Sequence, residues 1–185
     1  MSIRRKLALG AILALAALVY FFFTHRPTGP VRRPAGTPFD AKIASSGIRD
    51  LGVSTPPEPV PGAMEALFAR CRAFRYREDE GGDHWQTPAQ TESLGSGDCE
   101  DKAVWMFARL ARAGYRGLRL VIGRYRAVRN RYHVWVTYTD PRGTEYVIDA
   151  AAQKKIWKES DFPAGTYRPV YVYDGSGPVR RALRT

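Results

Sequence analysis

The sequence predicts an α+β domain in which two helices precede a mostly antiparallel sheet. Apolar residues recur at helical spacing over residues 63–75 and 99–113. Four later segments are rich in β-branched and aromatic residues, as strands are: 118–125, 132–139, 144–150 and 167–173. The Asp-Pro-Arg-Gly sequence at 140–143 reads as a hairpin turn between two of them. Helices followed by a run of strands with a short connection are typical of the α+β class.

The composition allows one folded domain with appendages. The chain has 185 residues, 44% of them hydrophobic, and a formal net charge of +11. The basic residues are spread along the sequence, with no zinc-finger spacing and no RNP-type sequence, so no nucleic acid is expected as a partner. The charge suits an anionic lipid surface or an acidic substrate equally well. The oligomeric state cannot be predicted from this pattern.

The first 23 residues have the character of a membrane segment. Residues 7–23 form an uncharged apolar run of 17 residues, directly after the basic residues 4–6. A cleaved signal peptide is the alternative, because Ala14-Leu15-Ala16 has the small-x-small form of a cleavage site. The apolar run continues to Phe23, which favours an uncleaved signal anchor over residues 1–23. The short basic N-terminal tail predicts a cytoplasmic N-terminus and a domain on the other side of the membrane.

Proline marks the next segment, residues 24–62, as a linker. It contains eight of the 13 prolines of the chain, and such a segment is extended and semi-rigid. Within it, residues 39–51 are compatible with a docked turn or a short helix. We predict the folded domain over residues 63–174 and a frayed basic tail over 175–185.

The segments that border the predicted site are a loop and the start of a helix. Residues 78–97 are expected to form a loop, and 154–161 an irregular segment or short helix. The helix over 99–113 should start with Asp98 as its N-cap and Asp101 at the capping-box position. Its solvent-facing side should carry Lys102, Arg109 and Arg112.

The most informative residue is Cys99, which follows a glycine-rich turn at the predicted start of this helix. A helix N-terminus offers free backbone N–H groups and partial positive charge. Both favour a thiolate, so this is a common place for a nucleophilic cysteine. The alternative is a structural disulfide with Cys71, the other cysteine, which would exclude such chemistry. We favour a free Cys71, because it lies on the apolar stripe of the helix over 63–75.

A nucleophilic thiol needs a base and a group that orients the base. His25 falls in the linker and His84 in the expected loop, whereas His133 falls in a strand. In a hairpin that pairs residue 133 with residue 149, His133 and Asp149 lie side by side on one face. A carboxylate there would fix the imidazole tautomer and stabilise the imidazolium. Cys99, His133 and Asp149 are therefore the candidate catalytic residues.

An acyl-transfer site also needs donors for an oxyanion. The backbone N–H of Cys99 is one candidate. The side chain of Gln86 or the indole N–H of Trp85 could supply a second from the preceding loop. Packing or loop structure explains these two residues equally well.

The motifs Trp85-Gln86-Thr87-Pro88 and Leu94 to Ala103, together with His133 and Asp149, resemble the bacterial transglutaminase-like cysteine peptidases. The resemblance covers about residues 63–173. It implies a papain-like or transglutaminase-like core with the nucleophile at the N-terminus of a helix packed on an antiparallel sheet. It also implies that Cys99 is the nucleophile, His133 the general base and acid, and Asp149 the orienting group.

The acidic residues beside the cysteine allow two interpretations. Asp98, Glu100 and Asp101 place like charges next to a would-be thiolate and should raise the pKa of Cys99. They could simply cap the helix and complement its dipole. The resemblance implies instead that these three acids bind calcium, a cation that takes carboxylate oxygens. Additional ligands from the loop over 78–92 would then be needed. The cysteine chemistry itself requires no cofactor.

The resemblance implies a peptidase that acts on a protein substrate. Combined with the signal anchor, it predicts a single-pass protein of the bacterial inner membrane, held through residues 7–23, with its catalytic domain in the periplasm. Two alternatives stay open: transglutaminase or amidase chemistry on the same residues, and a non-catalytic binding domain. One departure concerns the substrate, because Ala89-Gln90 follow Pro88 where that family usually has an acidic residue.

Overall fold

The computed structural model of the chain describes residues 36–49, 51, 62–128 and 130–182. The predicted signal anchor over 1–23 and most of the predicted linker lie outside these residues. Within the described part, none of the helices has the length and apolar character needed to cross a membrane.

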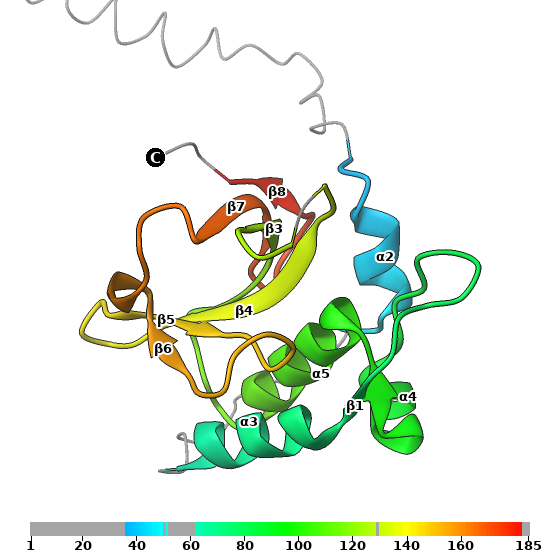
Figure 1. The fold of residues 1–185 in the computed structure, drawn as a ribbon, viewed down its shortest axis with the longest axis horizontal. Helices are drawn as coiled ribbons and strands as arrows, with labels where there is room; N and C mark the ends of the chain where they lie inside the picture. The colour runs from blue at the N-terminus through cyan, green and yellow to red at the C-terminus, as the bar shows by residue number, and fades with distance from the viewer. Residues whose placement is uncertain (1–35, 50, 52–61, 129, 183–185) are drawn as a thin grey trace, which may run out of the picture. The chain divides into compact units, whose positions relative to one another are not determined.

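The centre of the domain is a six-stranded sheet in which every neighbouring pair of strands is antiparallel, in the order β6-β5-β4-β3-β7-β8 (Figure 1). Its strands are β3 (Leu118–Tyr125), β4 (His133–Thr139), β5 (Glu145–Ile148), β6 (Trp157–Lys158), β7 (Tyr167–Tyr173) and β8 (Arg180–Arg181). A 3-10 turn, η1 (Glu159–Asp161), follows β6. The antiparallel sheet expected from the sequence is confirmed.

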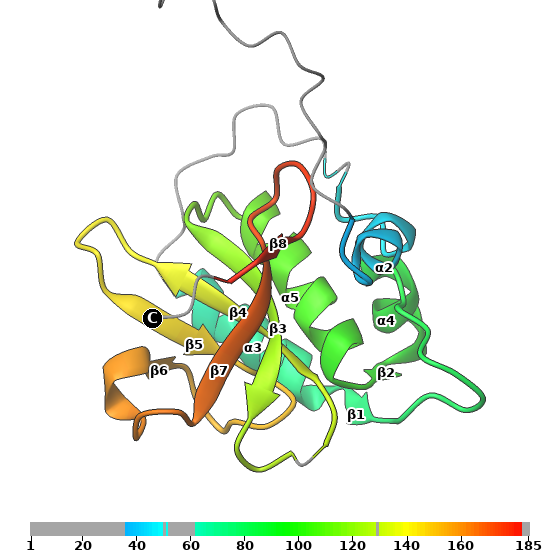
Figure 2. The same cartoon turned by 90° about the horizontal axis from the view of Figure 1, so that it is seen from above.

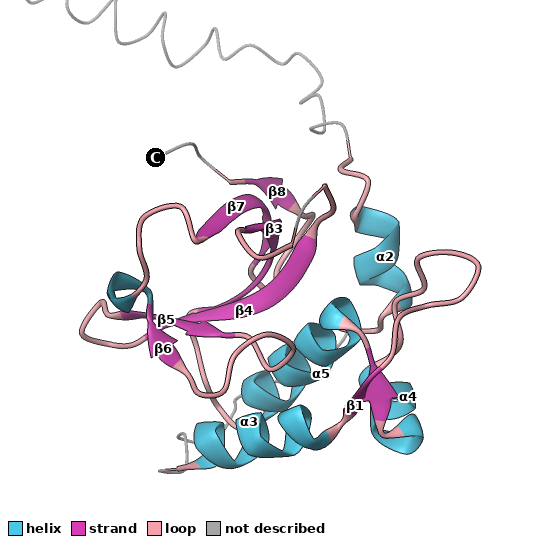
Figure 3. Ribbon diagram, in the orientation of Figure 1, coloured by secondary structure: helices cyan, strands magenta, loops and turns pink. Residues whose placement is uncertain are grey.

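The helices lie on one side of this sheet, as Figures 2 and 3 show; the last of them contacts β3 and β4, and the two before it pack against that helix. The helices are α2 (Asp40–Ser45), α3 (Ala63–Ala73), α4 (Pro88–Leu94) and α5 (Cys99–Arg112). The even-numbered side chains of β4, such as Val134 and Val136, form one core with α5 side chains such as Trp105 and Leu110. The helix start at Cys99 is as predicted, and this packing fixes where that start lies.

Helix α5 begins with a reciprocal capping box. The Asp98 side chain accepts from the backbone of Asp101, and the Asp101 side chain accepts from the backbone of Asp98. The expectation that Lys102 faces solvent is wrong. Lys102 is 4% exposed, and its Nζ donates to the carbonyl of Phe74 at 2.7 Å. The end of α3 thus covers the face of α5 that carries Lys102.

The segment expected to be a loop, 78–97, contains a helix. The side chain of Thr87 accepts from the backbone of Gln90, the Gln90 side chain accepts from the backbone of Thr87, and Pro88 occupies the first helical position. After α4, strand β2 (Ser96–Gly97) pairs in parallel with β1 (Arg75–Tyr76) and leads directly into α5. The residues before Cys99 are therefore held by regular structure.

The domain also extends beyond its predicted ends. The compact unit begins at Gly36, and Ile43 and Ile48 from the predicted linker are buried in the core. Helix α2 is the short docked helix considered above. At the other end, β8 pairs with β7 inside the segment predicted as a frayed tail, and Val179 is buried. In both places, apolar side chains bury against the core and order the chain.

The hairpin register differs from the prediction by two residues. Thr139 pairs with Glu145 and Thr137 with Val147, whereas the prediction paired Thr137 with Glu145. The cause is a longer connection, in which Asp140 Oδ1 accepts from the backbone N–H groups of Arg142 and Thr144 at 2.9 and 2.8 Å. Because side chains alternate along a strand, a shift of two residues keeps the same residues on each face.

A glycine in β3 allows the sheet to approach this hairpin closely. A Cβ on Gly123 would lie 2.3 Å from the carbonyl oxygen of Arg168 and 2.7 Å from the Trp135 ring, at the point where the β3–β7 register shifts. We expect Gly123→Ala to lower the free energy of unfolding by about 1–3 kcal/mol, the usual cost of overpacking. Urea denaturation measures this, and Gly36→Ala is the control because its Cβ would meet only the Asp40 carboxylate, at 3.4 Å, and its φ is not in the left-handed region. Equal losses in both variants would contradict the account.

Candidate active site

His133 and Asp149 meet at the end of the sheet where β4 begins. Both side chains are buried, and His133 Nε2 lies 2.7 Å from Asp149 Oδ2. A carboxylate can only accept, so Nε2 carries the proton of this hydrogen bond. The other ring nitrogen, Nδ1, is then the one available as a base. The two-residue change in register leaves them diagonal neighbours on the shared face.

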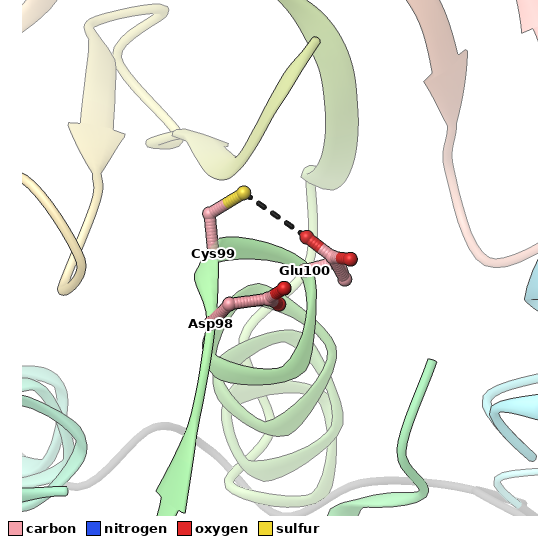
Figure 4. Close-up of side chains that lie close together, drawn as sticks. All are labelled: Asp98, Cys99 and Glu100. Atoms are coloured by element: carbon pink, nitrogen blue, oxygen red, sulfur yellow. Dashed lines mark hydrogen bonds between the residues drawn. The ribbon is translucent and has the colours of Figure 1, made fainter. Parts of the chain in front are cut away.

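Cys99 and His133 line the same cavity, of about 750 Å³. Cys99 is the first residue of α5, and its Sγ donates to Glu100 Oε2 at 3.0 Å (Figure 4). Both cysteines are free thiols, so the disulfide alternative is excluded. Cys71 is buried and its Sγ donates to the carbonyl of Lys102 at 3.5 Å.

Burial and nearby acids keep the thiol protonated in this structure. Burial and then Glu100 raise the pKa of Cys99. Burial and the neighbouring Asp98 raise the pKa of Glu100 to about 9, and burial raises that of Asp98. Cys99 therefore lies at a helix start, a position that suits a nucleophile, but the groups around it oppose its ionisation.

These acids belong to a larger cluster of carboxylates. Ligand atoms of Asp79, Asp83 and Glu100 lie within 4.8 Å of one another, as do those of Asp98, Cys99 and Glu100. Asp98 Oδ1 is buried and has no hydrogen-bond partner among the described residues. Convergent carboxylate oxygens, one of them unsatisfied, fit a hard divalent cation. Lys42 of α2 reaches the outer side of the cluster, with Nζ 3.0 Å from Asp83 Oδ2.

Asp101 lies in neither of these two groups. Its Oδ1 accepts from the backbone N–H of Gln86 at 2.8 Å, and its Oδ2 from that of Asp98 at 3.3 Å. Asp101 is fully buried, and burial raises its pKa to about 6. Its carboxylate thus ties the loop before α4 to the first turn of α5.

We expect Asp101→Ala to lower the free energy of unfolding by about 2–4 kcal/mol, because two buried N–H groups lose their acceptor. Chemical denaturation measures the change. Glu65→Ala is the matched control, since Glu65 is an exposed acid in the first turn of α3; it should change stability by less than about 0.5 kcal/mol. Similar values for the two variants would show that Asp101 does not hold this turn.

The two oxyanion candidates are engaged differently. The Trp85 indole N–H donates to Asp83 Oδ1 at 3.1 Å, so it is committed to the acidic cluster although the ring lines the cavity. Gln86 is not among the residues that line the cavity, and its buried Oε1 has no partner among the described residues. The Trp85 donor is thus engaged by Asp83, and Gln86 lies outside the lining of the cavity that contains Cys99.

Sequence reasoning missed three contributors to the site. Asp79 and Asp83 come from the acidic loop, where the only signal was the expected need for further cation ligands. Phe39 lines the cavity from α2, next to Tyr132, with ring centroids 5.5 Å apart. Nothing in the local sequence of α2 indicates that it borders the site.

A thiol at a helix start and a histidine–aspartate pair on the adjoining sheet are the arrangement of groups that cysteine peptidases use. No family model matches the sequence, and no curated protein matches it either. Among solved structures, Legionella pneumophila LapG is 27% identical, over 71% of this chain and 74% of that chain, with a TM-score of 0.58. Its calcium-bound structure is 26% identical with the same coverage and TM-score. The EGTA-treated structure, also 26% identical, covers 72% and 73% with a TM-score of 0.59.

These matches confirm the resemblance seen in the sequence. In fold the chain resembles the transglutaminase-like cysteine peptidases of the LapG type, and these neighbours point to a cysteine peptidase.

Proposed function

We propose that this chain is a membrane-anchored, periplasm-facing cysteine peptidase that cuts a protein substrate with Cys99, His133 and Asp149. The observation that carries the proposal is the buried hydrogen bond of 2.7 Å between His133 Nε2 and Asp149 Oδ2. It leaves Nδ1 as the basic nitrogen of a histidine that lines one cavity with Cys99. The LapG-type fold supports the same assignment.

In the proposed reaction, His133 Nδ1 takes the proton from Cys99 Sγ as the sulfur attacks the carbonyl carbon of the scissile peptide bond. Asp149 stabilises the imidazolium that forms. His133 then gives this proton to the departing amine, the carbon–nitrogen bond breaks, and a thioester to Cys99 remains. His133 next deprotonates a water molecule that attacks the thioester. This step releases the new carboxyl terminus and returns the proton to the thiol.

The oxyanion donor that this proposal retains is the backbone N–H of Cys99, at the start of α5. Backbone N–H groups of a first helical turn have no intrahelical acceptor and suit a developing negative charge. The Trp85 indole would become a second donor only after leaving Asp83, to which it donates in this structure.

We further propose that the acidic cluster holds calcium. Asp98 and Glu100 would be ligands from the start of α5, with Asp79 and Asp83 from the loop before α4. The sequence grouped Asp101 with the ligands. In this proposal it would instead stabilise the first turn of α5, through the hydrogen bonds that it accepts from the backbone of Gln86 and Asp98. When bound, the cation supplies positive charge that offsets the carboxylates beside the thiol. The calcium-bound structure of the LapG neighbour supports this choice of metal.

The cleavage test uses a pool of peptides derived from a proteome, because it requires no known substrate. We expect the full-length chain in calcium to generate new termini that share a sequence pattern, and the Cys99→Ser variant to generate none. Adding a primary amine separates the alternatives, since a transglutaminase would attach the amine to glutamine side chains. A pool left uncut and unmodified by the wild-type chain would overturn the catalytic proposal.

The membrane part of the proposal rests on the apolar run over 7–23. We expect the full-length chain to remain with the membrane pellet after an alkaline carbonate wash, and a chain lacking residues 1–23 to be released. In spheroplasts, protease added from outside should digest the domain. Protection of the domain under these conditions would show the opposite orientation.

A further inference from the structure

The carboxylate of Asp149 is surrounded by four hydrogen-bond donors. Oδ1 accepts from the backbone N–H groups of Ala151 and Ala152 at 3.1 and 3.0 Å. Oδ2 accepts from His133 Nε2 at 2.7 Å and from the hydroxyl of Tyr167 at 2.8 Å. Tyr167 therefore shares with His133 the one oxygen that holds the imidazole.

The direction of the tyrosine hydrogen bond follows from its other partner. The Tyr167 hydroxyl lies 2.9 Å from Gln153 Nε2, which also lies 3.1 Å from the hydroxyl of Tyr125. An amide nitrogen only donates and a carboxylate only accepts, so Tyr167 accepts from Gln153 and donates its own proton to Asp149. Burial, then the Asp149 charge, raise the pKa of Tyr167, so the hydroxyl keeps its proton.

Aromatic packing holds the Tyr167 ring in this position. Tyr125 of β3 and Tyr167 of β7 are register partners, and their rings stack with centroids 4.7 Å apart and an interplanar angle of 15°. The Tyr125 ring lies 5.3 Å from the His133 ring, and the Trp135 ring lies 5.0 Å from Tyr167. The hydroxyl therefore reaches Asp149 from a ring that cannot easily turn away.

We propose that Tyr167 is a positioning residue, which acts on His133 by fixing the Asp149 oxygen that the imidazole uses. The proposal rests on the catalytic roles proposed above for His133 and Asp149. With two donors on each oxygen, the carboxylate plane is set relative to Nε2. Loss of the tyrosine hydroxyl leaves Oδ2 with His133 alone, so the carboxylate and the imidazole gain freedom together.

The matched variants are Tyr167→Phe and Tyr125→Phe. Each removes one hydroxyl held by Gln153 Nε2 and keeps a stacked ring, but only the first removes a donor to Asp149. We expect both proteins to fold, since the aromatic packing is kept. A fall in the thermal midpoint of either variant is recorded alongside the site measurements.

The first measurement is an NMR spectrum of the full-length chain with 15N-labelled histidine, in which the His133→Gln variant assigns the signal. We expect an Nε2–H resonance of His133 that is protected from exchange with water. In Tyr167→Phe this resonance should shift and exchange at least tenfold faster, whereas in Tyr125→Phe it should stay. An unchanged signal in Tyr167→Phe, or equal changes in both variants, would overturn the proposal.

The second measurement is the rate at which iodoacetamide alkylates Cys99, followed by intact mass. We expect at least a fivefold fall in Tyr167→Phe and less than a twofold change in Tyr125→Phe. Equal falls in the two variants would show that the ring packing matters rather than the hydroxyl, and would overturn the proposal. If His133→Gln alkylates as fast as wild type, the proposed catalysis fails; the NMR comparison then still decides whether Tyr167 acts on His133.

Discussion

The His133→Ala variant is expected to alkylate at Cys99 about 100-fold more slowly than wild type, because a positioned base contributes roughly 10²–10⁴-fold to such chemistry. The reason is that burial and Glu100 raise the pKa of Cys99, so the thiol does not ionise on its own. His133 is the histidine that lines the same cavity as Cys99. The rate with iodoacetamide in the presence of calcium, read by intact mass, measures this directly.

The matched control is His84→Ala, which removes a histidine of the exposed loop before α4. Its alkylation rate should equal that of wild type. Asp149→Asn should also lower the alkylation rate of Cys99, because an amide does not stabilise an imidazolium as a carboxylate does. Equal rates in wild type and His133→Ala would show that His133 does not activate the cysteine, and would favour the non-catalytic binding domain.

The second large effect concerns the cation. Calcium is expected to raise the alkylation rate of Cys99 at least about tenfold over the rate in EGTA, since each unit by which a pKa falls is a factor of ten in ionisation. In the structure, Cys99 Sγ donates to Glu100 Oε2, and the carboxylates around it oppose a thiolate. A cation that takes those oxygens removes this opposition.

The variant for this prediction is Glu100→Gln, which removes a proposed calcium ligand and the acidic group beside the thiol. It should alkylate at the same rate with and without calcium, whereas the exposed-acid control Asp161→Asn should respond as wild type does. Thermal unfolding gives a reading independent of the thiol: calcium at about 100 times its dissociation constant stabilises by about 2.7 kcal/mol. If calcium changes neither the thermal midpoint nor the alkylation rate of the wild-type chain, the proposed cation site is contradicted.

The parts of the site that could be predicted from sequence are those fixed by local rules. Cys99 at the start of a helix followed from the glycine turn and from Asp98 as N-cap, and the structure contains this capping box. The common face of His133 and Asp149 followed from strand alternation, which a two-residue register shift does not disturb. A local signal was also overlooked, since Thr87, Pro88 and Gln90 carry the usual start of a helix.

The parts that could not be predicted depend on packing between distant segments. Lys102 looks like a solvent-facing residue by its charge, yet its Nζ is buried and donates a hydrogen bond to the carbonyl of Phe74. Asp83 meets Glu100 only because β1 and β2 bring the acidic loop back to the start of α5. Phe39 borders the cavity because Ile43 anchors α2 to the core. None of these contacts has a signature within a window of neighbouring residues.

The central claim is that Cys99, His133 and Asp149 act as one catalytic group. Its most direct test is a crystal structure of the calcium-loaded chain, in which the separation of Cys99 Sγ and His133 Nδ1 is measured. We expect Sγ to leave Glu100 and to lie within hydrogen-bonding distance of Nδ1, while Nε2 keeps its hydrogen bond to Asp149 Oδ2. A sulfur that stays on Glu100 with calcium bound, or a His133 ring whose Nδ1 faces away from the cavity, would contradict the central claim.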